Sequence, residues 1–230
     1  LVAQVENDSE SFVAGLNKIT GGNLWRIDRP KSANWTTATV RRDKAGQEQV
    51  LLQSGKGIHA VNPASGKVEW HYADGAATIP SSVLAGDMLF VPSHGLTALK
   101  LGADGKSFEQ KWRSGRLRPG TASPLVHGRK VYSLNNAGVL ACADVDSGNR
   151  LWQLRLDGPF GGSPVVADNH MYIFSEEGFA QVVDLTAPEG NVVGKMDLGE
   201  MIQCSPAVSN GALFVRSNGH IWKISRKTRL

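Results

Sequence analysis

Residues 120–158 read GTASPLVHGRKVYSLNNAGVLACADVDSGNRLWQLRLDG and contain four short apolar runs separated by polar turns. The first run begins at Ser123-Pro124, and proline suits the first residue of a strand because it has no N–H to donate to a sheet. Residues 135–138 (NNAG) supply Asn and Gly, which tolerate the positive φ of tight hairpin turns. The stretch therefore predicts four antiparallel strands joined by hairpins, a β-meander.

The same unit recurs along the chain with a period near 40 residues. The Ser-Pro step returns at Ser163-Pro164 and Ser205-Pro206, with gaps of 40 and 42 residues between the prolines, and Ser81-Ser82 stands in the same place. A tryptophan in the fourth run of each unit stands at Trp25, Trp70, Trp112 and Trp152. Four short strands at this period predict a β-propeller, in which each blade is a four-stranded antiparallel sheet.

The tryptophan belongs to a longer pattern, in which a small residue is followed by Asn or Asp two positions later, Gly six later and Trp ten later. The pattern starts at Gly15, Ala60 and Cys142. The copy that starts at Ala98 carries four extra residues before its tryptophan, and in the fifth copy counting places Val193 at the tryptophan position. A β-sandwich would not keep Gly and Trp in register at one period. We expect the tryptophans to be structural, with indole N–H groups that can donate to backbone carbonyls.

The repeat divides the chain into blades. We expect them at residues 1–33 (partial), 34–77, 78–118, 119–160, 161–201 and 202–225 (partial). The first partial blade lacks its inner strand and the last lacks its outer strand. This arithmetic favours a single β-propeller domain over residues 1–230 that is the carboxyl-terminal part of a larger ring. A five-bladed ring with a displaced terminal strand is the alternative.

The composition is that of a soluble, turn-rich all-β protein, with 41% hydrophobic and 20% charged residues, 26 glycines and 10 prolines. No apolar run approaches the roughly 20 residues of a transmembrane helix, and the first residues do not read as a signal peptide. The net charge is only +4, and the basic residues are scattered apart from residues 113–118 and 226–229. A nucleic-acid surface would need a basic stripe with interleaved aromatic residues, so we expect no nucleic-acid partner.

The two cysteines, Cys142 and Cys204, fall in blades that are not neighbours. Their Cα atoms should therefore lie beyond the ~7 Å that a disulfide tolerates. We expect two free and mostly buried thiols, which is the usual state of structural cysteines.

No residue pattern indicates a catalytic or metal site. The histidines (59, 71, 94, 127, 170 and 220) show no His-x-x-x-His or Glu-x-x-His spacing, and we interpret His94, His127 and His170 as turn residues. The acidic residues Asp144, Asp146 and Asp184 also fall in turns, where Asp is favoured for its own backbone hydrogen bonds. Residues 55–57 (GKG) open a strand, so they do not form a phosphate-binding loop. We expect no catalytic residue and no metal ligand.

In a propeller, the residues that lead into the innermost strands lie at the mouth of the central channel. Here these are Thr36, Ser81, Thr121, Gly162 and Gln203. They are mostly small and uncharged, which suits a water-filled channel better than acid–base chemistry. We assign no site to them, and cofactor-binding residues stay unknown.

The repeat resembles the pyrroloquinoline quinone (PQQ) repeat, and nearly the whole chain resembles the PQQ-like β-propellers of bacteria, above all the PQQ-binding-like β-propeller repeat proteins. The Ser-Pro step and the Asn/Asp-x-x-x-Gly-x-x-x-Trp pattern carry the likeness. So does the run of residues 16–26, which leads into Asn34-Trp35-Thr36-Thr37. The resemblance implies a ring of seven or eight blades. It also implies that Trp25, Trp70, Trp112 and Trp152 dock against a neighbouring blade.

For function, the resemblance implies a non-catalytic, periplasmic or secreted scaffold that holds a protein partner or a small ligand at one face of the ring. An outer-membrane assembly lipoprotein of the same repeat family is the example. The alternative is a quinoprotein dehydrogenase that oxidises alcohols or sugars with PQQ and calcium, and a hydrolase or another enzyme hosted on the ring is a third possibility. Dehydrogenases of this kind need clustered oxygen ligands for the cation and often a Cys-Cys pair, which this chain lacks. We therefore expect no cofactor and no enzymatic activity.

Overall fold

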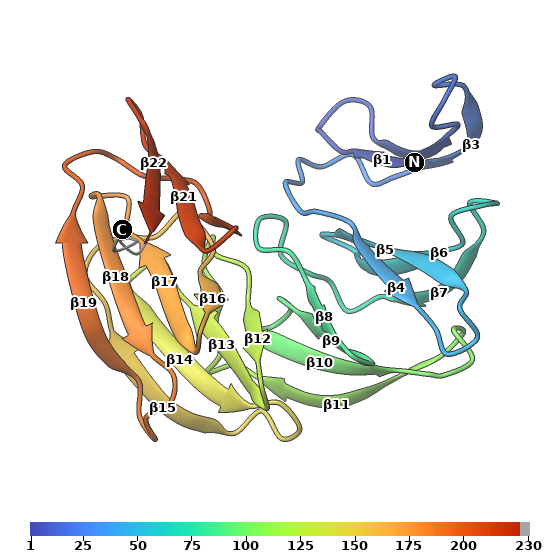
Figure 1. Cartoon of the computed structure of the whole chain (residues 1–230). Helices are drawn as coiled ribbons and strands as arrows, with labels where there is room; N and C mark the ends of the chain where they lie inside the picture. Colours follow the sequence, from blue (N-terminus) through green and yellow to red (C-terminus); the bar gives the residue numbers. More distant parts are fainter. Residues whose placement is uncertain (226–230) are drawn as a thin grey trace. The chain divides into compact units, whose positions relative to one another are not determined.

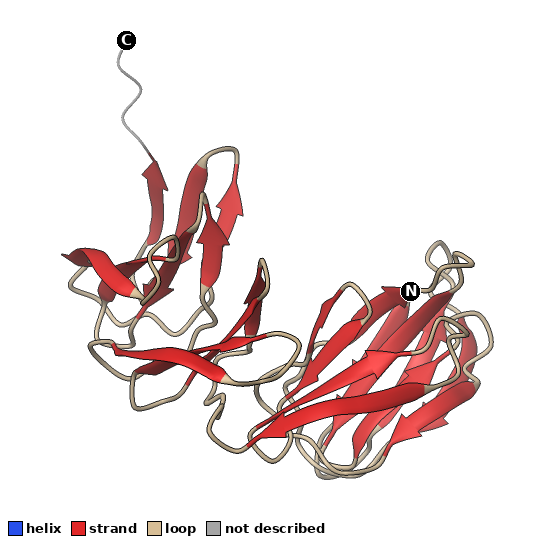
Figure 2. Cartoon of the chain, turned by 90° about the horizontal axis from the view of Figure 1, so that it is seen from below, coloured by secondary structure: helices blue, strands red, loops and turns tan. Residues whose placement is uncertain are grey.

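The computed structural model describes residues 1–225, and in this range every regular element is a β-strand (Figure 2). The chain divides into two compact units, Leu1–Gly115 and Arg116–Leu230. Each unit is considered on its own.

The first unit holds three antiparallel meanders (Figure 1). The first has three strands, β1 (Val2–Val5), β2 (Phe12–Leu16) and β3 (Asn23–Asp28). The second has four, β4 (Thr39–Arg42), β5 (Glu48–Ser54), β6 (Gly57–Val61) and β7 (Val68–Tyr72). The third also has four, β8 (Val83–Ala85), β9 (Met88–Val91), β10 (Leu96–Leu101) and β11 (Phe108–Ser114).

The second unit also has three antiparallel meanders, but its two four-stranded sheets come first and its three-stranded sheet comes last. Its two four-stranded sheets are β12 (Leu125–His127), β13 (Lys130–Leu134), β14 (Val139–Asp144) and β15 (Arg150–Arg155), then β16 (Val165–Ala167), β17 (His170–Phe174), β18 (Phe179–Asp184) and β19 (Asn191–Asp197). The last sheet has three strands, β20 (Ala207–Ser209), β21 (Ala212–Arg216) and β22 (Ile221–Ser225). The predicted all-β architecture of four-stranded antiparallel blades is thus confirmed.

The register of the strands explains the repeated small residue. Gly15 of β2 pairs with Trp25 of β3, and Cys142 of β14 pairs with Trp152 of β15. In both sheets a β-bulge directly follows the small residue. The indole lies across its small partner, because a Cβ added to Gly15 would overlap the ring of Trp25. A large side chain in the third strand would therefore displace the tryptophan.

The fifth copy departs from the prediction. The structure pairs Val182 with Gly194, again just before a bulge, so Gly194 and not Val193 stands at the tryptophan position. Val182 and Gly194 are 12 residues apart, whereas Cys142 and Trp152 are 10 apart. The connection in the fifth copy is therefore two residues longer, and a count along the sequence stops short of Gly194. Val193 is the extra residue of the bulge and is 51% exposed.

Within each unit, the buried apolar residues gather between consecutive sheets, and three of the tryptophans dock there. Trp25 donates its indole N–H to the carbonyl of Pro63 in the second sheet (2.8 Å). Trp152 packs against Gly190 of the following sheet, and Trp70 packs against Phe108 of the following sheet with ring centroids 5.1 Å apart. Docking is thus confirmed for these three tryptophans.

The indole N–H groups behave less uniformly than expected. Those of Trp70 and Trp152 have no acceptor among the described residues, so the predicted bond to a carbonyl forms at Trp25. Trp112 packs on Phe90 of its own sheet, with ring centroids 5.8 Å apart.

Candidate functional site

The loops that lead into the innermost strands are linked by the serines of the repeat. The residues singled out there, Thr36, Ser81, Thr121, Gly162 and Gln203, each lie just before one of the strands β4, β8, β12, β16 and β20. In the first unit, the N–H of Thr37 donates to Ser81 Oγ (2.9 Å). In the second unit, the N–H of Ser123 donates to Ser163 Oγ, and the N–H of Ser163 donates to Ser205 Oγ (both 2.9 Å). These serines connect neighbouring sheets.

A buried polar cluster joins the first sheet to the second. Arg29, directly after β3, donates from Nε to Oε1 of Glu6, directly after β1, at 2.6 Å, and each side chain is only 1% exposed. The other carboxylate oxygen of Glu6 accepts from Nδ2 of Asn34 (2.6 Å), which also donates to the carbonyl of Gln53 (2.8 Å). We call Glu6, Arg29, Asn34, Gln53 and His59 the inter-sheet cluster.

The cluster reaches across the second sheet. Arg29 Nη1 donates to Nδ1 of His59 in β6. The side chain of Gln53 in β5 donates to the carbonyls of Ala77 (2.6 Å) and Pro80 (2.9 Å) and accepts from the N–H of Ser82 (2.7 Å). The cluster therefore connects the first two sheets of the first unit and the loop that leads into the third. Its buried polar groups are hydrogen-bonded, as stable interiors require.

His59 is held in its neutral form. Burial, together with the smaller effects of the neighbouring His71 and Arg29, lowers the pKa of His59 to about 4. The His59 and His71 rings contact each other, with centroids 4.0 Å apart. The ring nitrogen that faces Arg29 is thus an acceptor near neutral pH, so His59 serves as a hydrogen-bond acceptor for the arginine.

The stability of the protein should fall as His59 titrates. The pKa of His59 is about 4 in the folded protein, against an ordinary value of 6.5 for histidine, so the unfolded chain binds an extra proton between these values. Folding stability is therefore fully present above about pH 6.5 and decreases toward about pH 4. In urea denaturation across this range, His59→Gln, which keeps an acceptor for Arg29, should lose less stability than the wild type. If the stabilities of the two proteins changed equally with pH, that result would contradict a lowered pKa for His59.

A cavity of about 550 Å³ lies beside the inter-sheet cluster. Its walls are formed by Glu6, Pro30, Lys31, Ser32, Asn34, Ser54, Gly55 and Lys56. Both oxygens of the Glu6 carboxylate accept hydrogen bonds, from Arg29 and from Asn34. The cavity can hold a polar ligand through amide, hydroxyl and ammonium groups, and its one carboxylate is engaged in holding the sheets together.

Two large apolar side chains are exposed on the connections that precede β4 and β8 of the first unit. Trp35 is 68% exposed and Ile79 is 45% exposed. The N–H of Trp35 donates to the carbonyl of Thr78 (2.8 Å), so the two loops are fastened to each other. The neighbouring Asn34 is also fixed by the inter-sheet cluster. We call these two exposed side chains, which stand on hydrogen-bonded loops, the Trp35–Ile79 surface.

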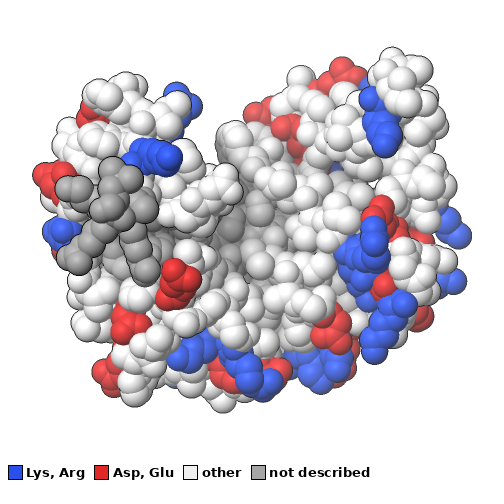
Figure 3. All heavy atoms as spheres, in the orientation of Figure 1, with Lys and Arg blue, Asp and Glu red and all other residues white. Residues whose placement is uncertain are grey.

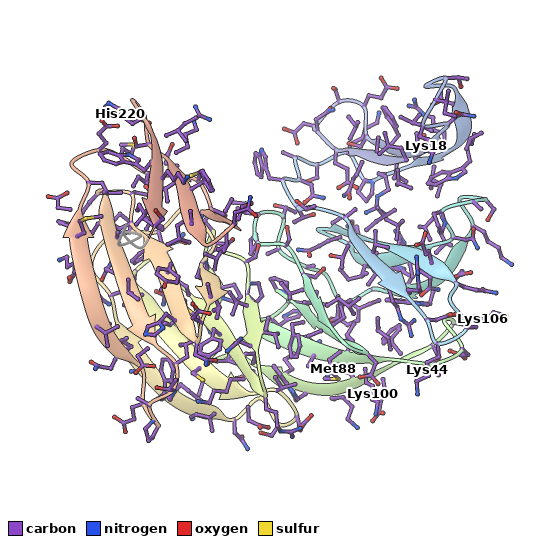
Figure 4. All side chains as sticks on the ribbon, viewed as in Figure 1. Lys18, Lys44, Met88, Lys100, Lys106 and His220 are labelled. Carbon is purple, nitrogen blue, oxygen red and sulfur yellow. The ribbon has the colours of Figure 1, made fainter. Side chains whose placement is uncertain are left out.

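A second cavity, of about 760 Å³, lies between the second and third sheets of the first unit. Lys44 and Lys100 belong to its walls and lie in the same part of this unit in Figure 4, but so do Asp43, Asp87 and Glu109. Figure 3 likewise shows blue and red atoms interspersed over the visible face. This cavity therefore has no single sign of charge to select a ligand.

The basic segments singled out in the sequence have different outcomes. Arg113 donates to Asp74 and to the hydroxyl of Tyr72 (3.1 Å). It therefore has a structural role in the first unit. Residues 226–229 lie outside the described residues.

Both cysteines are free, as predicted. Burial raises the pKa of the Cys142 thiol to about 11, so it is not a thiolate near neutral pH and is a poor nucleophile. Cys204 is only half-buried, which is more exposure than predicted, because it lies in the loop before β20. Its Sγ lies 3.2 Å from the carbonyl oxygen of Arg216.

Asp144 and Asp184 are the last residues of β14 and β18, so the prediction that they lie within turns was wrong, but both accept local hydrogen bonds from the turns that follow. Asp144 accepts from the hydroxyl and the N–H of Ser147 (both 2.9 Å), and these two bonds lower its pKa. Asp184 accepts hydrogen bonds from the N–H of Thr186 (2.8 Å) and from its hydroxyl. These two bonds lower the pKa of Asp184. Asp146 pairs with Arg129 at the surface.

The remaining histidines are dispersed. His94 lies in a turn at φ 49°, whereas His127 ends β12 and His170 begins β17, so these two were wrongly placed inside turns. His220 pairs with Glu200 at the surface (2.5 Å). Among residues 1–225, no three His, Cys, Asp or Glu side chains converge as a metal site would require. The same range holds no helix long and apolar enough to cross a membrane.

The sequence did not indicate the inter-sheet cluster. Glu6, Arg29 and Asn34 lie in connections, outside the repeating pattern. The only local signal is a charged residue directly after a strand, which usually means a solvated strand end. Only the packing of one sheet on the next brings these side chains together.

Known proteins resemble this chain in sequence pattern and in fold. A family model described as "Outer membrane protein assembly factor BamB" matches residues 2–87, 101–193 and 136–229. The crystal structure of BamB from Moraxella catarrhalis covers 98% of this chain and 69% of its own, at TM-score 0.65 and 20% identity. The computationally designed Ika8 protein covers 97% and 67%, at TM-score 0.69 and 12% identity. At these identities the likeness shows the fold alone. No curated protein sequence matches.

Proposed function

Because this chain belongs to the PQQ-like repeat family described as outer membrane protein assembly factor BamB, we propose that it is a non-catalytic β-propeller that binds a partner protein. It serves as an interaction scaffold in the periplasm or outside the cell. The description of the family names an assembly factor, and a scaffold is the corresponding role for this chain.

The Trp35–Ile79 surface is the observation that carries the proposal. An exposed tryptophan beside a second exposed apolar side chain is unfavourable in water, and such patches mark interaction sites. Tryptophan is also enriched among the residues that contribute most to protein–protein binding. The backbone bond between Trp35 and Thr78 (2.8 Å) keeps the pair in place, which lowers the entropy lost on binding.

The chemistry of the polar groups supports a binding role over catalysis. The buried carboxylate of Glu6 is paired with Arg29, His59 is an acceptor for the same arginine, and Cys142 is a buried thiol of raised pKa. Each of these groups holds the fold together. None of them forms the pair of nucleophile and oriented base that covalent catalysis needs.

Trp35→Ala should weaken partner binding with little effect on folding. Loss of a central tryptophan anchor costs about 2 kcal/mol or more, which is roughly a thirtyfold loss of affinity. A photo-reactive amino acid at position 79 in the source cells would identify the partner, and the affinity of wild type and variant for it would follow by calorimetry.

The control is Leu24→Ala, which removes another exposed apolar side chain of the same unit. It should leave both binding and thermal stability unchanged. Equal affinity of the Trp35→Ala variant and the wild type would contradict the proposed role of this surface.

We also propose that the chain binds no PQQ. Calorimetric titration with PQQ, with and without calcium, should give no heat of binding at micromolar quinone. Saturable binding that depends on calcium would instead support the dehydrogenase alternative.

A further inference from the structure

The cavity beside Glu6 has walls that come from three loops of the first unit. Glu6 lies between β1 and β2, the stretch 30–34 lies between β3 and β4, and residues 54–56 lie between β5 and β6. Described strands thus stand before and after each wall segment. The volume of about 550 Å³ falls within the roughly 300–1,000 Å³ of small-molecule sites, so the cavity is large enough for a small molecule.

The walls of this cavity carry an excess of positive charge. Lys31 and Lys56 both belong to them and are exposed, and among residues 1–225 neither ammonium group has an ion-pair or hydrogen-bond partner. The one carboxylate of the walls, that of Glu6, already pairs with the buried guanidinium of Arg29 at 2.6 Å. Two positive charges are therefore left without a counter-charge.

A buried hydroxyl of the walls has a hydrogen left to donate. Ser54 is 2% exposed, and its Oγ accepts from the N–H of Lys56 (3.2 Å). A hydroxyl also has one hydrogen of its own to donate, and the described residues supply no acceptor for that of Ser54. A buried donor without an acceptor is unfavourable. An anion in the cavity would provide the missing acceptor.

The loops around the cavity are fastened to their neighbours. The N–H of Ala33 donates to Oδ1 of Asp8 (3.0 Å), which holds the connection before β4 to the loop after β1. Asp8 itself does not belong to the walls. In the third loop, Nε2 of His71 donates to the carbonyl of Lys56 (3.2 Å). A site whose backbone is already held in place loses less entropy when a ligand binds.

The donors of the cavity match a phosphate group better than a carboxylate. A phosphate monoester carries a charge of about −1.5 to −2 near neutral pH and three strong acceptor oxygens, whereas a carboxylate carries one charge. Lysine binds phosphate as a point charge, and two lysines can balance both charges of one monoester. The cavity is also many times larger than the ~30 Å³ that one water occupies in the liquid, so it leaves room for the rest of the molecule.

We infer that this cavity binds the phosphate group of a phosphate monoester, with Lys31 and Lys56 as counter-charges and Ser54 as a hydrogen-bond donor. Glu6 makes no contact with the ligand, since both of its oxygens accept from Arg29 and Asn34. The inference goes beyond the proposed scaffold function and does not depend on it.

The first probe is glycerol 3-phosphate, titrated into the whole protein by calorimetry at low ionic strength, where charges are weakly screened. We expect saturable binding with one site. Glycerol, which lacks the phosphate, should give no heat of binding. Succinate, which has two carboxylates, should bind at least about tenfold more weakly than glycerol 3-phosphate.

The double variant Lys31→Met with Lys56→Met should bind glycerol 3-phosphate at least about tenfold more weakly than the wild type, because it removes both charged donors. The matched control is Lys44→Met with Lys100→Met, which removes the same charge from the second cavity of this unit and should bind normally. Both pairs of lysines are exposed, so all variants should unfold at the wild-type temperature without ligand.

Ser54→Ala tests the buried hydroxyl separately. It keeps both lysines and should weaken the binding of glycerol 3-phosphate by about threefold or more, since one hydrogen bond to a charged group is lost. Thermal unfolding gives a second measurement, because a ligand that binds only the folded protein raises its midpoint. Glycerol 3-phosphate should raise the midpoint of the wild type and leave that of the Lys31→Met, Lys56→Met variant unchanged.

A phosphate monoester can be free in solution or form the headgroup of a lipid. Sedimentation of the protein with vesicles that contain phosphatidic acid, compared with vesicles of phosphatidylcholine alone, distinguishes these sources. Binding of glycerol 3-phosphate without binding of the vesicles identifies a soluble ligand. Binding of the phosphatidic acid vesicles alone, when the Lys31→Met, Lys56→Met variant loses it, identifies a lipid headgroup.

The inference would be overturned if neither glycerol 3-phosphate nor phosphatidic acid bound. Equal losses in the two double lysine variants would also overturn it, since they would show an effect of net charge alone. Succinate that binds as tightly as glycerol 3-phosphate would overturn the choice of phosphate. Each of these failures leaves the Trp35 experiment unaffected, because that experiment measures a partner protein and changes neither lysine.

Discussion

Replacing Arg29 with methionine should lower the free energy of unfolding by about 3–5 kcal/mol, since it leaves a buried carboxylate without its cation. Glu6 and Arg29 are each 1% exposed at the side chain, so water cannot take over the role of the guanidinium. Asn34 would be the remaining donor to Glu6. Urea denaturation of the whole protein measures the change.

The matched control is Arg26→Met in the same sheet. Arg26 pairs with Glu10 at 2.5 Å, but both side chains are exposed, and exposed pairs contribute about 0–1 kcal/mol. A loss for Arg29→Met as small as that for Arg26→Met would show that the cluster is accessible to water.

The double variant Glu6→Gln with Arg29→Met tests the coupling of the pair. Removing both charges avoids an uncompensated buried ion, and such replacements are often close to neutral. The double variant should therefore be more stable than Arg29→Met alone. Additive losses from the two single substitutions would contradict a direct coupling.

Trp152→Ala should destabilise the protein by about 3–5 kcal/mol, the usual cost of truncating a buried tryptophan. Trp152 is 7% exposed and packs between Tyr132 of its own sheet and Gly190 of the next. The substitution thus opens a cavity between two sheets of the second unit. Thermal and urea unfolding measure the effect.

The matched control for this truncation is Trp35→Ala, because Trp35 is exposed and surface substitutions usually change stability by less than about 0.5 kcal/mol. A second test is Gly190→Ala, whose new Cβ would lie 2.5 Å from the Trp152 ring. It should destabilise the wild type more than the Trp152→Ala background. Equal effects in both backgrounds would show that the indole does not dock on Gly190.

The meander was predictable because its determinants are local. Turn residues, a proline at the start of a strand and a small residue opposite each tryptophan recur within one unit, so a repeat of about 40 residues makes them visible. The docking of Trp25 and Trp152 on the following sheet agrees with this pattern. The error at Val193 also has a local cause, since two extra residues between the paired positions of β18 and β19 move the register to Gly194.

The inter-sheet cluster was not predictable from any period. Glu6 and Arg29 are 23 residues apart in the sequence, and Arg29 and His59 are 30 apart. They meet because the connections after β1 and β3 pack on the second sheet. The neutral state of His59 likewise depends on burial, which a sequence does not show.

The pairing of residues within a blade was predictable from the sequence alone, because each hairpin brings together residues that are close along the chain. What lies between blades depends on tertiary packing, namely the Glu6–Arg29 pair and the Trp35–Ile79 surface. These features depend on the packing of one sheet against the next. Their residues belong to different repeats or to the connections between strands, where hydrophobic periodicity carries no information about neighbours.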